Sequence, residues 1–271
     1  MKIEEAKELA ENALAQLAET LEQGHSDELK KYLAAMAKFP RYSLHNILLI
    51  LAQRPDTPRV AGYHTWRELG RQVNRGAKGI LIFAPVVRRK AETNEQEEVS
   101  ADDGSPVKRL GFRGVYVFAE EDTSGRPVPG LSRCSGDPST FAERLRQFVT
   151  SRGIELEYSE SIRPALGQCT RGKIELLPGM DPAVEFSVLA HEVGHHLLHF
   201  GERRRETTKR VRETEAEAVA FVVSRTIGLE AMRSASEYIS LYSGDKDLLA
   251  ESLEHIQRAS AEIITAITPP G

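Results

Sequence analysis

The stretch from Val188 to Phe200, which reads VLAHEVGHHLLHF, restricts the fold of this chain more than any other feature. It places four of the eight histidines within nine residues. A helix is predicted here independently, because Asp181 and Pro182 form a typical N-cap and first turn and apolar residues follow at helical spacing. Such a helix either holds a metal or is a surface helix rich in imidazole, and the neighbouring segments must decide between the two.

The residues His191, Glu192 and His195 have the spacing H-E-x-x-H. Residues four apart on a helix point to nearly the same side, so both histidines can offer ring nitrogens to one zinc ion. Glu192 then stands beside the metal and can take a proton from metal-bound water, whose pKa zinc lowers towards neutrality. The pattern predicts His191 and His195 as ligands and Glu192 as the general base of a hydrolase.

A catalytic zinc site of this type needs a third protein ligand. The metzincin pattern is excluded, because Leu198 and Gly201 stand where it requires Gly and His. The later segment RETEAEAVAFVVSRTIG supplies a glutamate helix with small alanines on one face. We expect Glu213 to be the third ligand and Glu217 to hold a ligand histidine by its second ring nitrogen. Glu215 and Glu217 also precede an alanine by three residues, so both remain alternatives for the third ligand.

The chain of 271 residues is long enough for two domains. Amphipathic patterns predict helices at 3–21, 27–39 and 44–54, followed by strands of a small sheet at 59–63, 76–89 and 113–122. Residues 123–139 are rich in Gly, Pro and Ser and therefore mark the boundary. We predict an α+β protein with an N-terminal helix-plus-small-sheet domain, residues 1–130, and a C-terminal zincin-like domain, residues 138–271.

The second domain is expected to begin with a helix at 139–153 and a strand at 154–160. A further strand, Lys173 to Leu177, precedes the histidine helix. As an edge strand beside the metal, it would let an extended peptide add by main-chain hydrogen bonds. Tyr238 or Tyr242 could stabilise an oxyanion, although a core or surface role is the preferred interpretation of both.

Charge is unevenly distributed along the first half, although the net charge is only −4. Residues 41–90 carry ten basic side chains against two acidic ones, and aromatic residues stand between them. Bases stack on aromatic faces and phosphates meet guanidinium groups, so this composition suits single-stranded DNA. The predicted DNA-binding residues are Tyr42, Asn46, Trp66, Arg67, Arg71, Arg75 and Lys78. The alternative is a solvated basic face with the aromatics in the core.

Other features limit the cellular context. No apolar run approaches the eighteen or so residues of a membrane span, and the N-terminus is acidic and amphipathic. A cytoplasmic protein without a membrane partner is expected. Cys134 and Cys169 are far apart and have no C-x-x-C partner, so no thiolate zinc site is indicated. The six-acid stretch AETNEQEEVSADDG is expected to be a mobile hairpin loop.

Two parts of the sequence resemble a known family. The segments YSLHNILLILAQRP and RVAGYHTWRELGRQVNRGAKGILIFAPV resemble the N-terminal single-stranded DNA-binding domain of the ArdC-like antirestriction family, and GVYVFAEEDTSGRPVPG resembles its continuation. The segments KIELLPG, FSVLAHEVGHHLLH and RETEAEAVAFVV are similar to the zinc-peptidase domain that this family shares with the ImmA/IrrE metallopeptidases. The resemblance implies a DNA-binding module joined to a gluzincin-like metallopeptidase, with His191, His195 and Glu213 as ligands and Glu192 as base.

The function expected from these observations is that of a zinc-dependent endopeptidase acting on DNA-associated proteins. Its cofactor would be Zn²⁺, and its partners single-stranded DNA and a protein or peptide substrate. One alternative is a non-proteolytic antirestriction protein that protects single strands and uses its metal structurally. Another is a stress-responsive peptidase that cleaves a transcriptional repressor.

Overall fold

The computed structural model of the chain describes residues 3–23, 26–89, 99–100, 106–127, 138–229 and 245–268. The fold is α+β, as predicted. Its residues group into two compact units, one made of 1–12 and 49–127 and the other of 13–48 and 128–271. The predicted domains, 1–130 and 138–271, would assign 13–48 to the first unit. By contact this segment groups with the second, because its helix α2 (Ser26–Lys38) packs against helices near the C-terminus.

Three helices open the chain, in agreement with the predicted pattern: α1 (Ile3–Glu22), α2 and α3 (Leu44–Gln53). The apolar stripe of α1 is buried at Ala6, Ala10, Leu17 and Leu21. The predicted cap of α3 is also present, since the Ser43 Oγ accepts a hydrogen bond from the Asn46 backbone N–H at 3.4 Å.

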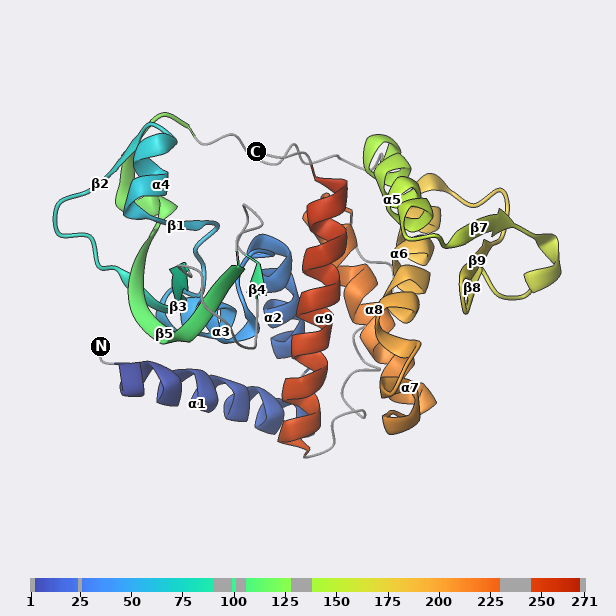
Figure 1. Cartoon of the computed structure of the whole chain (residues 1–271), viewed down its shortest axis with the longest axis horizontal. Coiled ribbons are helices and arrows are strands. Elements are labelled where there is room, and N and C mark those ends of the chain that lie inside the picture. Colours follow the sequence, from blue (N-terminus) through green and yellow to red (C-terminus); the bar gives the residue numbers. More distant parts are fainter. Residues whose placement is uncertain are drawn as a thin grey trace. The chain divides into compact units, whose positions relative to one another are not determined.

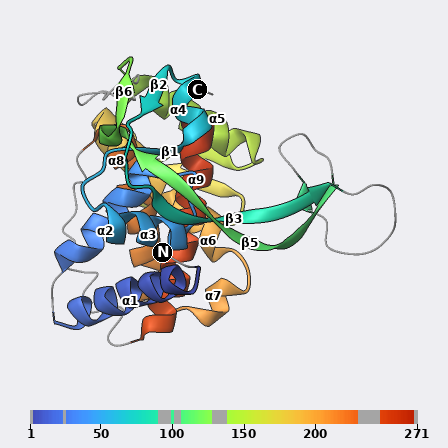
Figure 2. The ribbon, with the colours of Figure 1, turned by 90° about the vertical axis from the view of Figure 1, so that its left-hand side faces the viewer.

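The first unit contains an antiparallel sheet in the order β1-β5-β3, with β4 also paired to β5. Ile80 pairs with Val117 and Ile82 with Val115, and this face supplies buried residues of the core. Figure 2 shows β3 and β5 running side by side as a long twisted ribbon. The elements are β1 (Val60–Gly62), α4 (Tyr63–Glu68), β2 (Arg71–Val73), β3 (Ile80–Arg89), β4 (Val99–Ser100), β5 (Pro106–Ala119), the 3₁₀ helix η1 (Glu120–Asp122) and β6 (Thr123–Gly125), which pairs with β2.

The second unit is mainly helical. Its helix α6 packs on α8, and α8 packs on α9, while α5 contacts both α6 and α9 (Figure 1). After residue 138 its elements are α5 (Ser139–Ser151), β7 (Glu155–Tyr158), the 3₁₀ helix η2 (Glu160–Ile162), β8 (Gly167–Thr170), β9 (Lys173–Leu176), α6 (Pro182–His199), α7 (Arg203–Glu206), α8 (Lys209–Thr226) and α9 (Lys246–Ile267). The predicted start of α6 is confirmed, because the Asp181 side chain accepts a hydrogen bond from the Ala183 backbone N–H at 2.9 Å.

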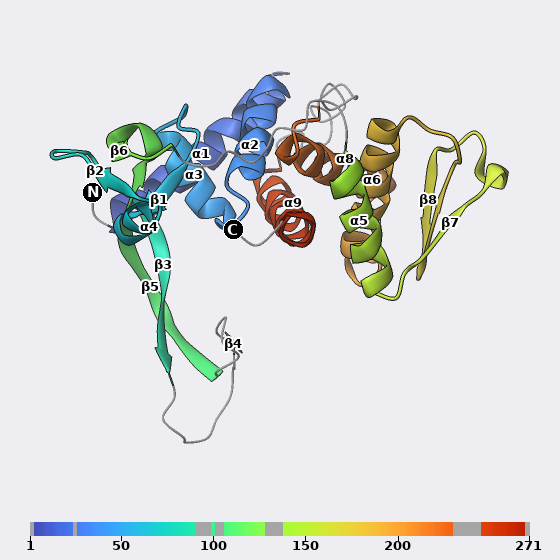
Figure 3. The same cartoon turned by 90° about the horizontal axis from the view of Figure 1, so that it is seen from above.

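The small sheet of this unit corrects one prediction. Its order is β7-β9-β8, with β7 parallel and β8 antiparallel to β9. The strand expected at the edge, Lys173 to Leu177, is therefore the central one, because strands pair with it on both sides. The edge strand that contacts α6 is β8, and Figure 3 shows β8 between α6 and β7.

Some predictions fall outside the described residues: those on Cys134, Tyr238 and Tyr242, and those on most of the acidic stretch and of the predicted boundary. Among the helices that are described, none is both long and apolar enough to cross a membrane.

Candidate metal centre

Helix α6 presents two histidines side by side. His191 and His195 are one turn apart, and their ring centroids are 4.7 Å apart in an edge-on arrangement. The helix is fixed by Phe186, Leu189 and Val193, which are buried in the core. The two histidines point to the same side of this helix, as their four-residue spacing predicts.

Helix α8 brings a carboxylate to the same point. The Glu213 Oε2 lies 3.7 Å from the His191 Nε2 and 3.5 Å from the His195 Nε2. One ligand atom from each of the three residues lies within 4.8 Å of the other two. A tetrahedral zinc ion with bonds of about 2.1 Å keeps its ligand atoms about 3.4 Å apart. The donor types and their spacing therefore fit one divalent cation.

The close approach of α6 and α8 depends on small residues. A Cβ added at Gly194 would lie 3.2 Å from the Ala216 Cα and 3.3 Å from the Val219 Cβ. A side chain at position 194 would therefore fit only if α8 gave way by a few tenths of an ångström. This contact explains why small residues share a helix face with Glu213.

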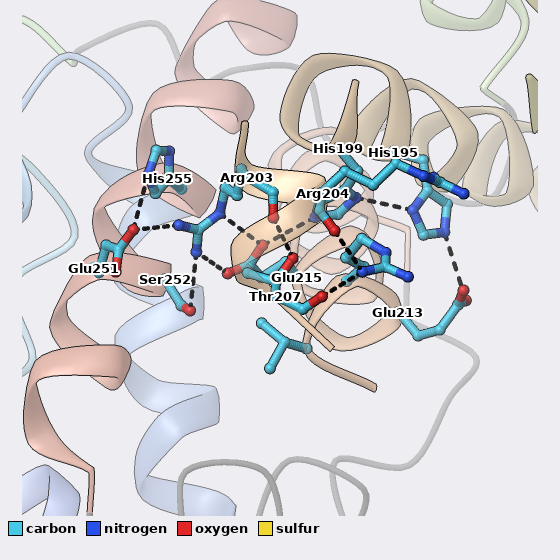
Figure 4. Close-up of polar contacts among 12 residues, drawn as sticks. His195, His199, Arg203, Arg204, Thr207, Glu213, Glu215, Glu251, Ser252 and His255 are labelled. Carbon is cyan, nitrogen blue, oxygen red and sulfur yellow. Dashed lines mark hydrogen bonds and ion pairs between the residues drawn. The ribbon is translucent and has the colours of Figure 1, made fainter. Parts of the chain in front are cut away.

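The second ring nitrogens of both histidines face away from the shared point. The His191 Nδ1 lies 3.4 Å from the Glu217 Oε2, and the His195 Nδ1 lies 3.0 Å from the His199 Nδ1 (Figure 4). Both Nε2 atoms are thereby left for a cation. Glu217 thus lies at the second ring nitrogen of His191, as expected from the sequence. His199 was expected to be a part-exposed polar residue, but it is 1% exposed.

The charges at this point are strongly coupled. Burial lowers the pKa of His191, but Glu213 and Glu217 raise it by more, to about 9. The two histidines in turn hold the pKa of Glu213 well below its usual range. The same negative field that retains a proton on His191 would favour a divalent cation in its place.

Glu192 is buried beside the two histidines, with a relative exposure of 6%. Burial raises its pKa, although the neighbouring His191 and His195 oppose this shift. Strand β8 passes directly behind it, since a Cβ added at Gly167 would lie 2.7 Å from the Glu192 Oε1. A carboxylate with a raised pKa in this position is suited to accept and return a proton.

These groups line a pocket of about 830 Å³. Its walls come from β8 and the loop before it, from α6, and from the segment that contains α7 and α8. Three basic residues of that segment also line the pocket: Arg204, Lys209 and Arg212. Histidine, carboxylate and basic side chains thus line one cavity, which is large enough for several residues of an extended peptide.

Three of the predicted DNA-binding residues are buried or hydrogen-bonded within the protein, so their side chains are not free to contact DNA. Trp66 is fully buried, and its indole Nε1 donates a hydrogen bond to the Phe118 carbonyl at 2.9 Å. Asn46 is also buried. The Arg71 guanidinium donates to the Thr123 Oγ1 at 2.7 Å and to the Arg126 carbonyl at 2.6 Å. As placed here, the Trp66 indole cannot stack on a base.

The other predicted residues are more accessible. Arg67, Arg75 and Lys78 are exposed, and Tyr42 is half-buried and belongs to the second unit. The first unit also exposes Tyr63, one of the aromatics that stand between the basic residues of 41–90, and two aromatics of β5 that were not predicted, Phe112 and Tyr116. The three side chains are 40%, 65% and 52% exposed. Phe112 and Tyr116 are four residues apart on β5, so they share one face of the strand. The alternation of side chains along this strand is the sequence signal that could have identified these two aromatics as neighbours.

Comparison with known proteins agrees with this architecture. Residues 7–118 match the family model for the N-terminal domain of anti-restriction factor ArdC. Over these residues the chain is ArdC-like. Two crystal structures of the antirestriction ArdC protein from the R388 plasmid resemble it at 18% identity, one metal-free with a TM-score of 0.54 and one Mn(II)-bound with 0.52. Each comparison covers 96% of this ArdC-like chain and 97% of the other, and shows a shared fold.

A curated relative from Bacillus anthracis, described as an uncharacterized protein, is 20% identical over 292 residues. The match includes 94% of the ArdC-like chain but only 49% of the relative. The chain therefore spans about half the length of this protein.

Proposed function

We propose that this ArdC-like chain is an antirestriction protein that binds single-stranded DNA and carries a zinc-dependent metallopeptidase site of the ImmA/IrrE type. The observation that carries the peptidase proposal is the meeting of His191, His195, Glu213 and Glu192 in one pocket. The Mn(II)-bound structure of R388 ArdC supports a divalent cation. The donor set of two imidazoles and one carboxylate favours zinc. We further propose a cytoplasmic location, where single-stranded DNA is accessible.

His191, His195 and Glu213 would hold the ion through their Nε2 and carboxylate atoms. When bound, the ion supplies Lewis acidity that polarises a peptide carbonyl and acidifies a water molecule. Glu192 would take a proton from water in the pocket and return it to the leaving amine. Because β8 lies at a sheet edge and lines the pocket, an extended peptide would add to it by main-chain hydrogen bonds. β8 would thus position the substrate beside Glu192.

The test uses the full chain loaded with zinc and a protein substrate. Glu192→Gln should keep the metal and abolish cleavage, because the amide cannot accept the proton. Glu213→Ala should lose the metal. Glu202→Gln is the matched control, since this exposed glutamate lies outside the pocket and should change neither property. Cleavage by Glu192→Gln at the wild-type rate would overturn the peptidase assignment.

The DNA proposal rests on the first unit, which contains most of the matched residues 7–118. Its accessible cations, Arg67, Arg75 and Lys78, would meet phosphates. Anisotropy of a labelled oligonucleotide should show affinity that falls steeply with salt, because each neutralised phosphate releases a counterion. The double change Arg75→Glu and Lys78→Glu should weaken binding at every sequence. Affinity that is independent of salt would contradict the proposal.

A second candidate is an antirestriction protein in which DNA protection needs no proteolysis. The matched family description, anti-restriction factor, favours it. Under this alternative Glu192→Gln protects DNA from restriction as well as the wild type does, whereas the doubly substituted Arg75 and Lys78 variant does not. A third candidate is cleavage of a transcriptional repressor, which an assay with a purified repressor as substrate tests.

A further inference from the structure

A chain of buried polar contacts leads away from the candidate metal centre. The His195 Nδ1 lies 3.0 Å from the His199 Nδ1, and the His199 Nε2 lies 2.9 Å from the Glu215 Oε2 (Figure 4). His199 is 1% exposed and Glu215 is fully buried. The proposed peptidase mechanism uses neither residue, although burying a histidine and a carboxylate is costly unless they are paired.

The hydrogen positions in this chain follow from one condition. If the His195 Nε2 binds a cation, the proton of the neutral ring must be on its Nδ1. That proton can be donated only to an unprotonated Nδ1 of His199. The ring of His199 then carries its own proton on Nε2 and donates it to the Glu215 carboxylate. Each group therefore donates to the next, His195 to His199 and His199 to Glu215.

The Glu215 carboxylate is fixed from its other side. The Arg203 Nε donates to the Glu215 Oε2 at 3.2 Å, and the Arg203 Nη2 donates to the Glu215 Oε1. The same guanidinium donates to Glu251 and, at 3.3 Å, to the Ser252 Oγ, both on α9 (Figure 4). Arg203 is thereby held by two helices, so Glu215 has little freedom to turn away from His199.

We propose that His199 and Glu215 are positioning residues that hold the His195 ring with its Nε2 towards the cation, and that Arg203 anchors this relay to α9. The proposal rests on the proposed metal site. A partner on the second nitrogen fixes both the orientation and the tautomer of a ligand histidine, and its loss typically weakens metal affinity 10–100-fold.

The variants are compared in the full chain by measuring the zinc dissociation constant in competition with a chromophoric chelator. His199→Leu should bind zinc roughly 10–100-fold more weakly. His199→Asn should recover part of the loss, because its Oδ1 can accept the proton of the His195 Nδ1. The control is His196→Leu, on the same helix, since among the described residues the His196 Nδ1 has no hydrogen-bond partner. Wild-type affinity in His199→Leu, or no recovery in His199→Asn, would overturn the relay.

A second measurement needs no variant. Long-range ¹H–¹⁵N NMR of the zinc-loaded wild type reports which nitrogen of each histidine carries the proton. We expect the proton on Nδ1 in His195 and on Nε2 in His199; a proton on the His199 Nδ1 contradicts the proposal. Neither readout requires cleavage. A chain that binds zinc but cleaves nothing would overturn the peptidase proposal alone.

Discussion

Replacing Gly167 with alanine should disable Glu192 while leaving the metal ligands in place. The added Cβ would lie 2.7 Å from the Glu192 Oε1, 2.7 Å from the Val188 Cγ1 and 2.9 Å from the Glu192 Cγ. Ordinary contacts between such atoms begin near 3.5 Å, so about 0.8 Å of overlap must be relieved. β8 is held by its pairing with β9, and the β-branched side chain of Val188 is stiff. The longer, unbranched side chain of Glu192 is therefore the group that moves most easily. A displacement of about 1 Å can cost roughly a hundredfold in rate.

The assay measures peptide cleavage, zinc affinity and unfolding by urea on the same preparations. We expect Gly167→Ala to lower the rate about a hundredfold, to leave zinc affinity within a factor of about three, and to cost about 1–3 kcal/mol of unfolding free energy through overpacking. Gly201→Ala is the control, because a Cβ there meets no described atom within 4 Å. Gly194→Ala should differ, since separating α6 from α8 withdraws Glu213 and weakens zinc binding. A wild-type cleavage rate in zinc-loaded Gly167→Ala would refute the placement of Glu192.

Three further outcomes follow from the structure. Trp66→Ala should lower the free energy of unfolding by about 3–5 kcal/mol in urea denaturation, because the indole is fully buried; a change below 1 kcal/mol would contradict its core position. Burial, reinforced by the Glu192 charge, raises the pKa of the Cys169 thiol to about 12. In a Cys134→Ser background its alkylation at pH 8 should therefore be roughly a thousandfold slower than that of a free cysteine, and equal rates would refute this. Phe112→Ala should weaken single-strand binding by about 1–3 kcal/mol if a base stacks there, and unchanged anisotropy would exclude that platform.

The elements that sequence predicted well are those encoded by local spacing. The start of α6 follows from Asp181 and Pro182, and the grouping of His191 with His195 follows from the helical repeat alone. Sheet order was not predictable in this way. The residues of β8, GQCT, show no apolar alternation, so no local pattern predicted a strand there. Residues 173–177 were therefore expected to form the edge of the sheet, a position that β8 occupies.

The DNA-binding prediction shows a different limit. Composition indicated that aromatic and basic side chains lie close together in the first half, but it could not say which aromatics face solvent. Trp66 lies in the core, where its indole N–H donates to the Phe118 carbonyl, whereas Phe112 and Tyr116 on β5 are exposed. Those positions depend on how strands pair over a long sequence distance, which a local pattern does not contain.

The glutamates of α8 lie in two different environments, although they stand at alternate positions of one acidic segment in the sequence. Glu213 and Glu217 are four residues apart and both reach His191, while Glu215 points to the opposite side of the helix, where it is fully buried. A buried carboxylate is tolerated only with partners, and Arg203 and His199 supply them. His199 is one further turn from His195, yet the sequence alone indicated a part-exposed polar residue there and not a buried partner of Glu215. The sequence did not indicate that Arg203 would pair with Glu215, because only the folded chain brings α7, α8 and α9 to the same point.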